Sequence, residues 1–156
     1  MTIAGADMNA RAPVPPVIWV FGVFSIVPLF IAAAIYCYGP ANMAGPGLLA
    51  LLAYSMGLLA FLGGVRCGLE FARRIQRWYV IGLSIIAPFV GFGLLLGSIR
   101  FDVVWQISGF LLAFLLQWVW DVNDHEGPEW RPRLRTLLTG GAVIPLAFAL
   151  EKALRM

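Results

Sequence analysis

The sequence predicts an all-α membrane protein, a bundle of five transmembrane helices over residues 17–150. Of its 156 residues, 61% are hydrophobic and 12% are charged, about half the charged fraction of an ordinary soluble domain. The mean hydropathy is +0.86. The apolar residues form runs of membrane-spanning length, separated by short stretches that contain glycine, proline or charged residues. Charges this scarce cannot cover a water-facing surface, which excludes the soluble classes.

The first part of the chain predicts a tail and two spans. Residues 1–16 form a cytoplasmic tail whose last prolines suit the start of a helix, because proline is tolerated in a first turn. We expect the first span over residues 17–38, bounded by the tryptophan and tyrosine side chains that gather at membrane interfaces. The uncharged stretch GPANMAGPG predicts a loop, and the second span follows over residues 47–69.

Three further spans are predicted over residues 78–99, 103–120 and 136–150, and residues 151–156 are expected to form a short tail. The last span holds 15 uncharged residues, fewer than the roughly 17 that a bilayer needs. Lys152 and Arg155 can extend this span by reaching the interface with their long side chains. The alternative is that the segment tilts or lies partly in the interface.

The odd-numbered spans each carry one central proline, Pro28, Pro88 or Pro145, which is expected to kink its helix. The run SIVPLF around Pro28 is similar to the run SIIAPF around Pro88. The run LLAFL occurs in both the second and the fourth span. These matches indicate a duplicated helical hairpin. Chance repetition in a chain rich in leucine and alanine is the alternative.

Lysine and arginine are divided unequally between the two predicted membrane faces. One face holds eight: Arg11, Arg66, Arg73, Arg74, Arg77, Arg131, Arg133 and Arg135. The other face holds three: Arg100, Lys152 and Arg155. Because short cytoplasmic loops carry the excess of positive charge, we expect an N-in, C-out protein of a bacterial inner membrane, or of the mitochondrial inner membrane in a eukaryote. The net charge of +3 is explained by these orientation signals in the loops, so we expect no nucleic-acid partner.

Neither the N-terminus nor the cysteines indicate an exported, disulfide-linked protein. The first residues lack a basic stretch that leads into a short apolar core, so we expect no cleaved signal peptide. Cys37 and Cys67 are predicted at opposite membrane faces, about 30 Å apart. A disulfide needs Cα atoms within about 7 Å, which excludes a bond between them.

Residues 53–77 are predicted to form the central helix, around which the bundle is organised. Six small side chains are expected to form its packing face: Ala53, Gly57, Ala60, Gly64, Cys67 and Gly68. The first five follow one another at spacings of four, three, four and three, which places them on one side of a helix. Small side chains let helices approach closely in lipid. We expect the other helices to pack here; a second copy and a foreign subunit are the alternatives.

Charged side chains at one end of this helix predict a salt bridge between helices. Arg66 and Glu70 are four residues apart and can pair along one face, and Asp121 ends the fourth span on the same membrane side. Charges near the membrane are costly unless they are paired or reach the headgroups. The alternative is that all three reach headgroup water. Six arginines are expected to contact lipid headgroups: Arg73, Arg74, Arg77, Arg131, Arg133 and Arg135.

No reactive constellation is predicted. His125 lies among Asp121, Asp124, Glu126 and Glu129, but the glycine is misplaced for a calcium-binding EF-hand loop and a lone histidine makes a weak metal site. A solvated acidic turn fits better. The chain shows no nucleophile–base pair, phosphate loop, paired-histidine ligand set or redox motif. We therefore expect no catalytic residue, no metal and no cofactor.

The run YSMGLLAFLGGVRCGLE resembles the signature of a bacterial and mitochondrial family of unknown function, typified by transmembrane protein 69. The matching residues are Tyr54, Phe61, Leu62, Gly63, Gly64, Arg66 and Gly68. Shorter stretches resemble further family features: Ser84 with Pro88, Trp120-Asp121, and Trp130, Leu134, Arg135, Leu138 and Thr139. Ala60 and Cys67 depart from the pattern, where the family tends to have serine and tryptophan. The resemblance covers about residues 17–150 and implies a five-helix inner-membrane protein with no established reaction.

These observations predict a non-catalytic accessory or assembly subunit of a larger membrane complex, because a small-residue helix face is combined with no reactive group. Its expected partners are the lipid bilayer and other membrane subunits or a second copy. The alternative is a small transporter or a protein that binds a lipophilic ligand between kinked spans. Few polar side chains at membrane depth, such as Gln106 and Gln117, would line such a pocket. A membrane enzyme would require a metal or cofactor in the acidic loop.

Overall fold

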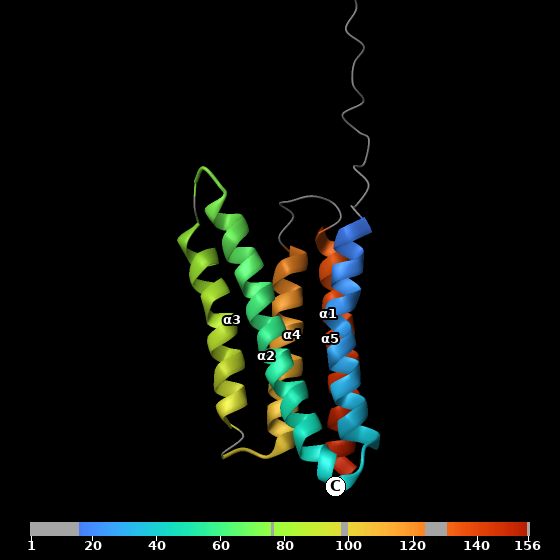
Figure 1. The fold of residues 1–156 in the computed structure, drawn as a ribbon. Helices are drawn as coiled ribbons and strands as arrows, with labels where there is room; N and C mark the ends of the chain where they lie inside the picture. Colours follow the sequence, from blue (N-terminus) through green and yellow to red (C-terminus); the bar gives the residue numbers. More distant parts are fainter. Residues whose placement is uncertain (1–15, 76, 98–99, 124–130, 156) are drawn as a thin grey trace, which may run out of the picture.

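The computed structural model describes residues 16–75, 77–97, 100–123 and 131–155, and all regular structure in these residues is helical. The helices are α1 (Pro16–Tyr38), α2 (Ala41–Phe71), α3 (Trp78–Leu96), α4 (Val103–Asn123) and α5 (Arg131–Arg155). They run alternately up and down side by side in one bundle (Figure 1). The predicted all-α fold class is thus confirmed for the described part of the chain.

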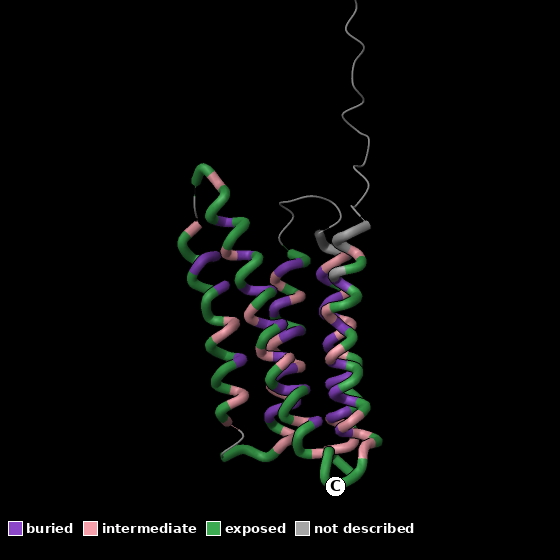
Figure 2. Tube along the Cα trace, in the orientation of Figure 1, coloured by how far each residue is buried: buried purple, intermediate pink, exposed green. Residues whose placement is uncertain are grey.

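Four of these helices have the length and composition needed to cross a membrane: α2, α3, α4 and residues Leu134–Arg155 of α5. The described apolar segment of α1, Gly22–Tyr38, is shorter. The outside of the bundle is apolar, and large side chains such as Phe24 and Phe89 are 71% and 69% exposed. Figure 2 shows exposed positions along the outward sides of the helices. An apolar surface of this extent is stable against lipid and not against water.

The predicted loop between the first two spans is mostly helix. After Gly39 and Pro40, α2 begins at Ala41, with Pro40 in an extended conformation at the N-cap. Pro46 lies in the second turn, where the backbone hydrogen bond that a proline removes is close to the helix end and costs less. Glycine and proline indicated a loop because they break helix interiors, but near a helix start proline is tolerated.

The last helix is longer at both ends than the predicted fifth span. It begins at Arg131, and residues 151–155, which were predicted to be a tail, continue it. At this end the ammonium group of Lys152 donates hydrogen bonds to the carbonyl oxygens of Tyr36 and Cys37. These carbonyls belong to the last turn of α1, which carries unpaired acceptors and partial negative charge. The segment therefore lies lengthwise along α1 and α4.

The core is enclosed by α1, α2, α4 and α5, and α3 lies outside it. Among the described residues, the buried hydrophobic cluster draws on these four helices, with members such as Leu29, Leu52, Phe110 and Leu146. The third helix packs mainly against α2 (Figure 1) and contributes only partly buried side chains to this cluster. Four helices thus form the body of the bundle, and α3 is attached along one side of it.

The predicted packing face of α2 is wrong for the contacts within this chain. Four of its small residues are exposed and two are half-buried: Ala53, Gly57, Gly64 and Gly68, and Ala60 and Cys67. A Cβ atom added at Gly57, Gly64 or Gly68 would meet nothing within 4 Å. The buried face is the opposite one, which includes Leu59 and Leu62. The leucine face is the buried one because a packed interior needs side chains that fill its volume, and not only backbones that come close together.

Within the predicted central segment, residues 53–77, the glycine that allows a helix to come close is Gly63. A Cβ atom at this position would lie 2.7 Å from the carbonyl oxygen of Ser84 and 3.2 Å from the Cβ of Ala87. On the facing helix, Gly91 approaches Met56 in the same way, because an added Cβ would lie 3.3 Å from its Cγ. The contact between α2 and α3 therefore depends on Gly63 and Gly91.

We expect Gly63→Leu to lower the free energy of unfolding by about 3 kcal/mol or more, because the new side chain collides with the backbone of α3. Gly64→Leu, one residue further on, is expected to leave stability unchanged within about 0.5 kcal/mol. Thermal unfolding of both variants in the same detergent measures the difference. Equal losses for the two variants would contradict this assignment of the packing face.

Candidate functional site: a buried cluster of arginines around Asp121

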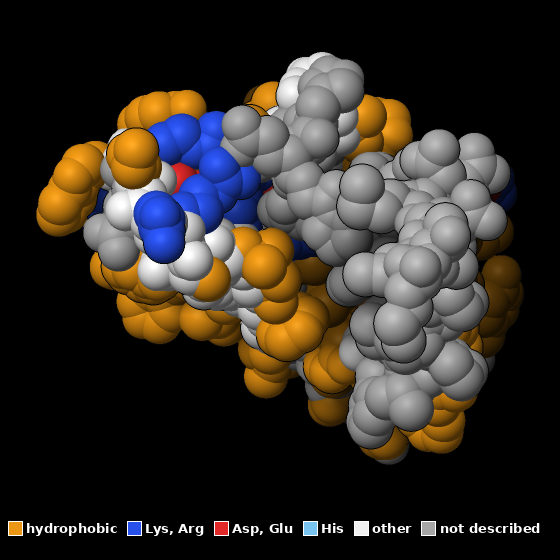
Figure 3. Space-filling view, turned by 90° about the horizontal axis from the view of Figure 1, so that it is seen from above, with side chains coloured by type: hydrophobic (Ala, Val, Ile, Leu, Met, Phe, Trp, Pro, Cys, Tyr) orange, Lys and Arg blue, Asp and Glu red, His pale blue; other side chains and the backbone are white. Residues whose placement is uncertain are grey.

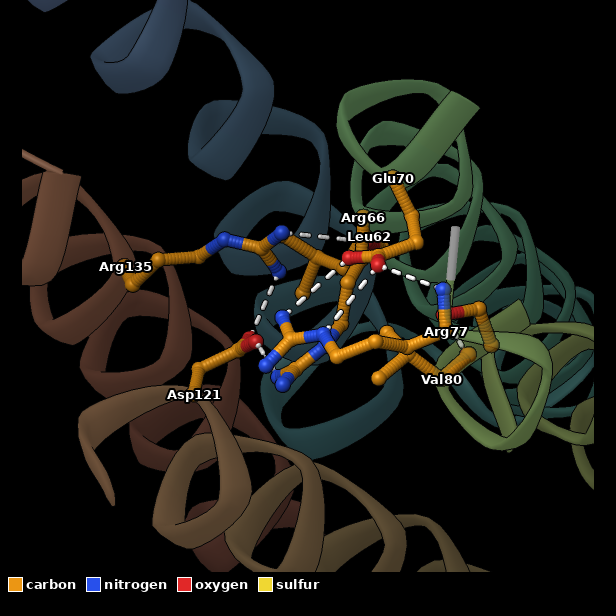
Figure 4. Close-up of polar contacts among 8 residues, drawn as sticks. Leu62, Arg66, Glu70, Arg77, Val80, Asp121 and Arg135 are labelled. Atoms are coloured by element: carbon orange, nitrogen blue, oxygen red, sulfur yellow. Dashed lines mark hydrogen bonds and ion pairs between the residues drawn. The ribbon is translucent and has the colours of Figure 1, made fainter. Parts of the chain in front are cut away.

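The carboxylate of Asp121 lies between two buried arginines from different helices. Its Oδ1 atom pairs with Nη1 of Arg66, and its Oδ2 atom lies 2.8 Å from Nη1 of Arg135. The side chains of Arg66 and Asp121 are 4% exposed, and that of Arg135 is 6% exposed. Their charges are therefore shielded from water. Figure 4 shows both guanidinium groups converging on Asp121. One carboxylate thus joins α2, α4 and α5.

Each member of this cluster is placed by its position near a helix end. Arg66 lies in the last two turns of α2, Asp121 in the last turn of α4 and Arg135 in the second turn of α5. Antiparallel neighbours bring these three ends to the same end of the bundle (Figure 1). The three charged side chains therefore meet inside the bundle near one of its ends, and the rest of each helix is largely apolar.

Two further contacts fix the guanidinium groups. The guanidinium carbon of Arg66 lies 3.8 Å from the centre of the Trp120 ring, a stacked cation–π contact. Nη2 of Arg135 donates a hydrogen bond of 3.1 Å to the backbone carbonyl oxygen of Leu62, one turn before Arg66. Arginine suits such a site because its planar group offers several donors in a fixed geometry. Both arginines are therefore fixed by contacts on more than one side.

A second carboxylate, Glu70, is the centre of a neighbouring group. Its Oε1 atom accepts hydrogen bonds from the backbone N–H and Nε of Arg77, at 2.9 and 3.1 Å, and its Oε2 atom lies 3.2 Å from Nε of Arg73. The side chain of Glu70 is 3% exposed, whereas Arg73 and Arg77 are 32% and 27% exposed. Glu70 therefore fixes the turn between α2 and α3, with arginines that still reach the surface.

The end of the bundle that carries both groups is rich in positive charge. Seen from above, Lys and Arg side chains gather around an acidic side chain on the described part of this surface (Figure 3). Arg74 is exposed here as well. Exposed or half-exposed arginines at this position suit contact with acidic lipid headgroups.

Of the sequence-based predictions, the ion pair between Arg66 and Asp121 is present in the structure. Arg135 was predicted to contact headgroups and does not, because its guanidinium is buried against Asp121 and Leu62. The side chains of Arg131 and Arg133 lie outside the described part of the chain, as does the acidic loop with His125. Among the described residues, no group of three or more His, Cys, Asp or Glu side chains is arranged to hold a metal ion. Both cysteines are free thiols.

Beside the cluster lies a cavity of about 250 Å³ between α2, α3 and α4. Its lining includes Gly63, Arg66, Ser84, Gln117 and Trp120. The Gln117 side chain is only 9% exposed, and its Oε1 atom is buried and accepts no hydrogen bond from any described residue. A buried carbonyl oxygen in this state costs about 1–3 kcal/mol. The cavity therefore has largely apolar walls, and the side-chain oxygen of one lining residue, Gln117, is buried without a donor.

Sequence reasoning missed Arg135, Gln117 and Trp120 as members of one site. One usable signal was the spacing on α4, where Gln117 precedes Asp121 by four residues and shares its helix face. Arg135 gave no such signal, because a positive-inside loop explained it equally well. Its partner is 14 positions away in the sequence and on another helix, so only the packing of α4 against α5 shows the pairing.

The fold and this site define an all-helical protein with membrane-length apolar helices and a buried ionic cluster at one end of the bundle. A family model described as "Protein of unknown function (DUF3429)" matches residues 14–151. The match covers most of the chain, so the protein belongs to this family. No curated protein and no solved structure matches the chain. The predicted resemblance to an uncharacterised family is confirmed at this level.

We expect Asp121→Asn to lower the free energy of unfolding by about 3–5 kcal/mol, because two buried arginines then share no carboxylate. Thermal unfolding in detergent measures the loss. The control is Asp102→Asn, an exposed position before α4, where asparagine caps a helix as well as aspartate does. If both variants unfold at the wild-type temperature, the cluster does not stabilise the bundle.

Proposed function

We propose that the protein is a non-catalytic integral membrane protein that serves as an accessory or assembly subunit of a larger membrane complex. All five helices cross the bilayer in this proposal, with the N-terminus inside. The membrane is the inner membrane of a bacterium or of a mitochondrion, in a family typified by transmembrane protein 69. The apolar outer surface and the arginine-rich end of the bundle support this placement.

The small-residue face of α2 is the single observation on which the accessory role depends. It lies opposite the buried face of the helix, and Gly57, Gly64 and Gly68 have open space above them. Elsewhere on the outer surface the bundle presents large side chains such as Phe24 and Phe89. Lipid tails require no such strip of glycine and alanine, whereas a transmembrane helix of a partner packs closely on one. The strip therefore supports association with another subunit or a second copy.

We expect the wild-type protein, extracted from its native membrane in mild detergent, to migrate with at least one additional subunit. Gly64→Leu is expected to migrate as a monomer, because a leucine there keeps a partner helix away from the α2 backbone. Blue native electrophoresis followed by mass spectrometry measures both. The matched control is Gly82→Leu, at another exposed glycine with nothing within 4 Å of an added Cβ.

Cys67 gives an independent readout because it belongs to the same strip and is half-buried. With Cys37 changed to serine, a short bifunctional maleimide is expected to link Cys67 to the partner in membranes. A link to a second copy identifies a homo-oligomer, and a link to another chain identifies a foreign subunit. A monomer in both experiments, whatever residue occupies position 64, would overturn the accessory role.

The cavity beside Arg66 supports a second candidate function, the binding of a lipophilic ligand. Its walls are largely apolar, and Ile86, Val90 and Leu116, which line it, are also exposed on the outer surface. The cavity therefore opens sideways between α3 and α4, toward the region that lipid would occupy. A membrane-dissolved molecule can enter it without passing through water.

A further inference from the structure

Two hollows in the described part of the bundle lie end to end between α3 and α4. On α4 the lining continues from residues 105–112 in the first to residues 113–120 in the second, which is the cavity beside Arg66. On α3 it continues from residues 93–94 to residues 83–90. Lining residues of both helices, such as Ile86 and Leu112, are exposed on the outer surface. The two hollows therefore form one apolar groove that opens sideways, toward the region that lipid would occupy.

Arginines mark one end of this groove. Arg66 lines the cavity there. On the opposite wall, Tyr79 lies four residues before the lining residue Leu83 and so shares its face of α3. The guanidinium carbon of Arg77 lies 5.9 Å from the centre of the Tyr79 ring. A cation is therefore placed where the α3 wall of the groove reaches the end of the bundle.

Arg77 is fixed in position and is still accessible from outside. Glu70 accepts hydrogen bonds from Nε and Nη2 of Arg77 at 3.1 and 3.2 Å (Figure 4), and Glu70 lies one turn beyond Arg66 on α2. The Arg77 side chain is 27% exposed, so a group outside the protein can reach it. A guanidinium binds phosphate well because its N–H donors form a planar fork.

The length of the groove and the level of its charged end suit a phospholipid. Trp78 and Tyr79, which are 81% and 63% exposed, are the side chains that gather at the level of lipid headgroups. Residues 105–120 of α4 span about 23 Å of helix, whereas one leaflet contributes about 15 Å of hydrocarbon. An acyl chain whose headgroup lies at Arg77 therefore fills the cavity beside Arg66 and extends toward the second hollow.

We propose that this groove binds one anionic phospholipid of the leaflet at the arginine-rich end of the bundle. One acyl chain lies between α3 and α4, and Arg77 binds the headgroup phosphate beside Tyr79. A zwitterionic headgroup is disfavoured because it brings its own cation close to the arginines. This proposal rests on the second candidate function, whose ligand class it names, and does not depend on association through α2.

Binding of two phospholipids with identical acyl chains to the full-length protein tests the selection for negative charge. The probes are palmitoyl-oleoyl phosphatidylglycerol and palmitoyl-oleoyl phosphatidylcholine, compared at equal concentrations in mild detergent by native mass spectrometry. We expect the first molecule of phosphatidylglycerol to bind roughly fivefold or more tightly, the effect of about one basic side chain near a headgroup. Equal affinity for the two lipids would overturn the proposal.

Three arginine variants locate the headgroup. Arg77→Gln is expected to reduce the preference to about twofold or less, because the charge at the end of the groove is gone. Arg77→Lys keeps that charge and is expected to keep the preference, which separates charge from the contact with Glu70. The matched control, Arg74→Gln, removes an exposed charge from the same turn, whereas Arg77 is the arginine that lies over Tyr79. A preference that falls equally in Arg74→Gln and Arg77→Gln contradicts the assignment.

Photolabelling of the wild-type protein shows where the acyl chain lies, even if a variant does not fold. Both lipids are prepared with a diazirine in one acyl chain, and labelled peptides are identified by mass spectrometry. We expect phosphatidylglycerol to label residues 83–90 and 113–120 more strongly than phosphatidylcholine does. Equal labelling there by both lipids leaves a lipophilic site and overturns the selection for an anionic headgroup. Labelling spread evenly over α1 and α5 overturns the site itself, and neither result bears on Gly64→Leu.

Discussion

The arrangement of the bundle depends on one carboxylate that is paired with two buried arginines. Asp121 joins the ends of α2, α4 and α5 in surroundings where an uncompensated charge is costly. Apolar packing alone allows helices to slide or rotate, because one leucine contact replaces another at little cost. A buried ion pair has no such substitute. The cluster forms only in the rotation that turns the face of α2 with Arg66, Leu59 and Leu62 inward.

That rotation gives α2 its two different faces. Arg66 and Glu70 are buried together with Leu59 and Leu62, so the strip of glycine and alanine on the opposite side is turned outward. The close approach of α3 depends instead on Gly63, next to the strip. Because α3 stays outside the four-helix core, a cavity remains between α2, α3 and α4, and Arg66 is part of its wall. Both proposed activities thus follow from how one helix is turned.

Three stretches that carried the family resemblance meet at this cluster. Arg66, the pair Trp120-Asp121, and Arg135 come from motifs far apart in the sequence, and the structure brings them into contact. Tyr54, from the first motif, donates a hydrogen bond of 2.9 Å to the carbonyl oxygen of Ser25 and so ties α2 to α1. The motifs therefore describe one structural unit.

The sequence by itself determined the helical class, the approximate positions of the helices and the end of the bundle where charge gathers. Apolar runs and charge counts carry this information because they describe how each segment interacts with its solvent. The partner of Arg135 and the inward face of α2 were decided only by the tertiary structure. A spacing of three and four residues shows that side chains share a helix face, but it does not show whether that face packs against another helix or faces lipid. That is decided by contacts between helices that are distant in the sequence.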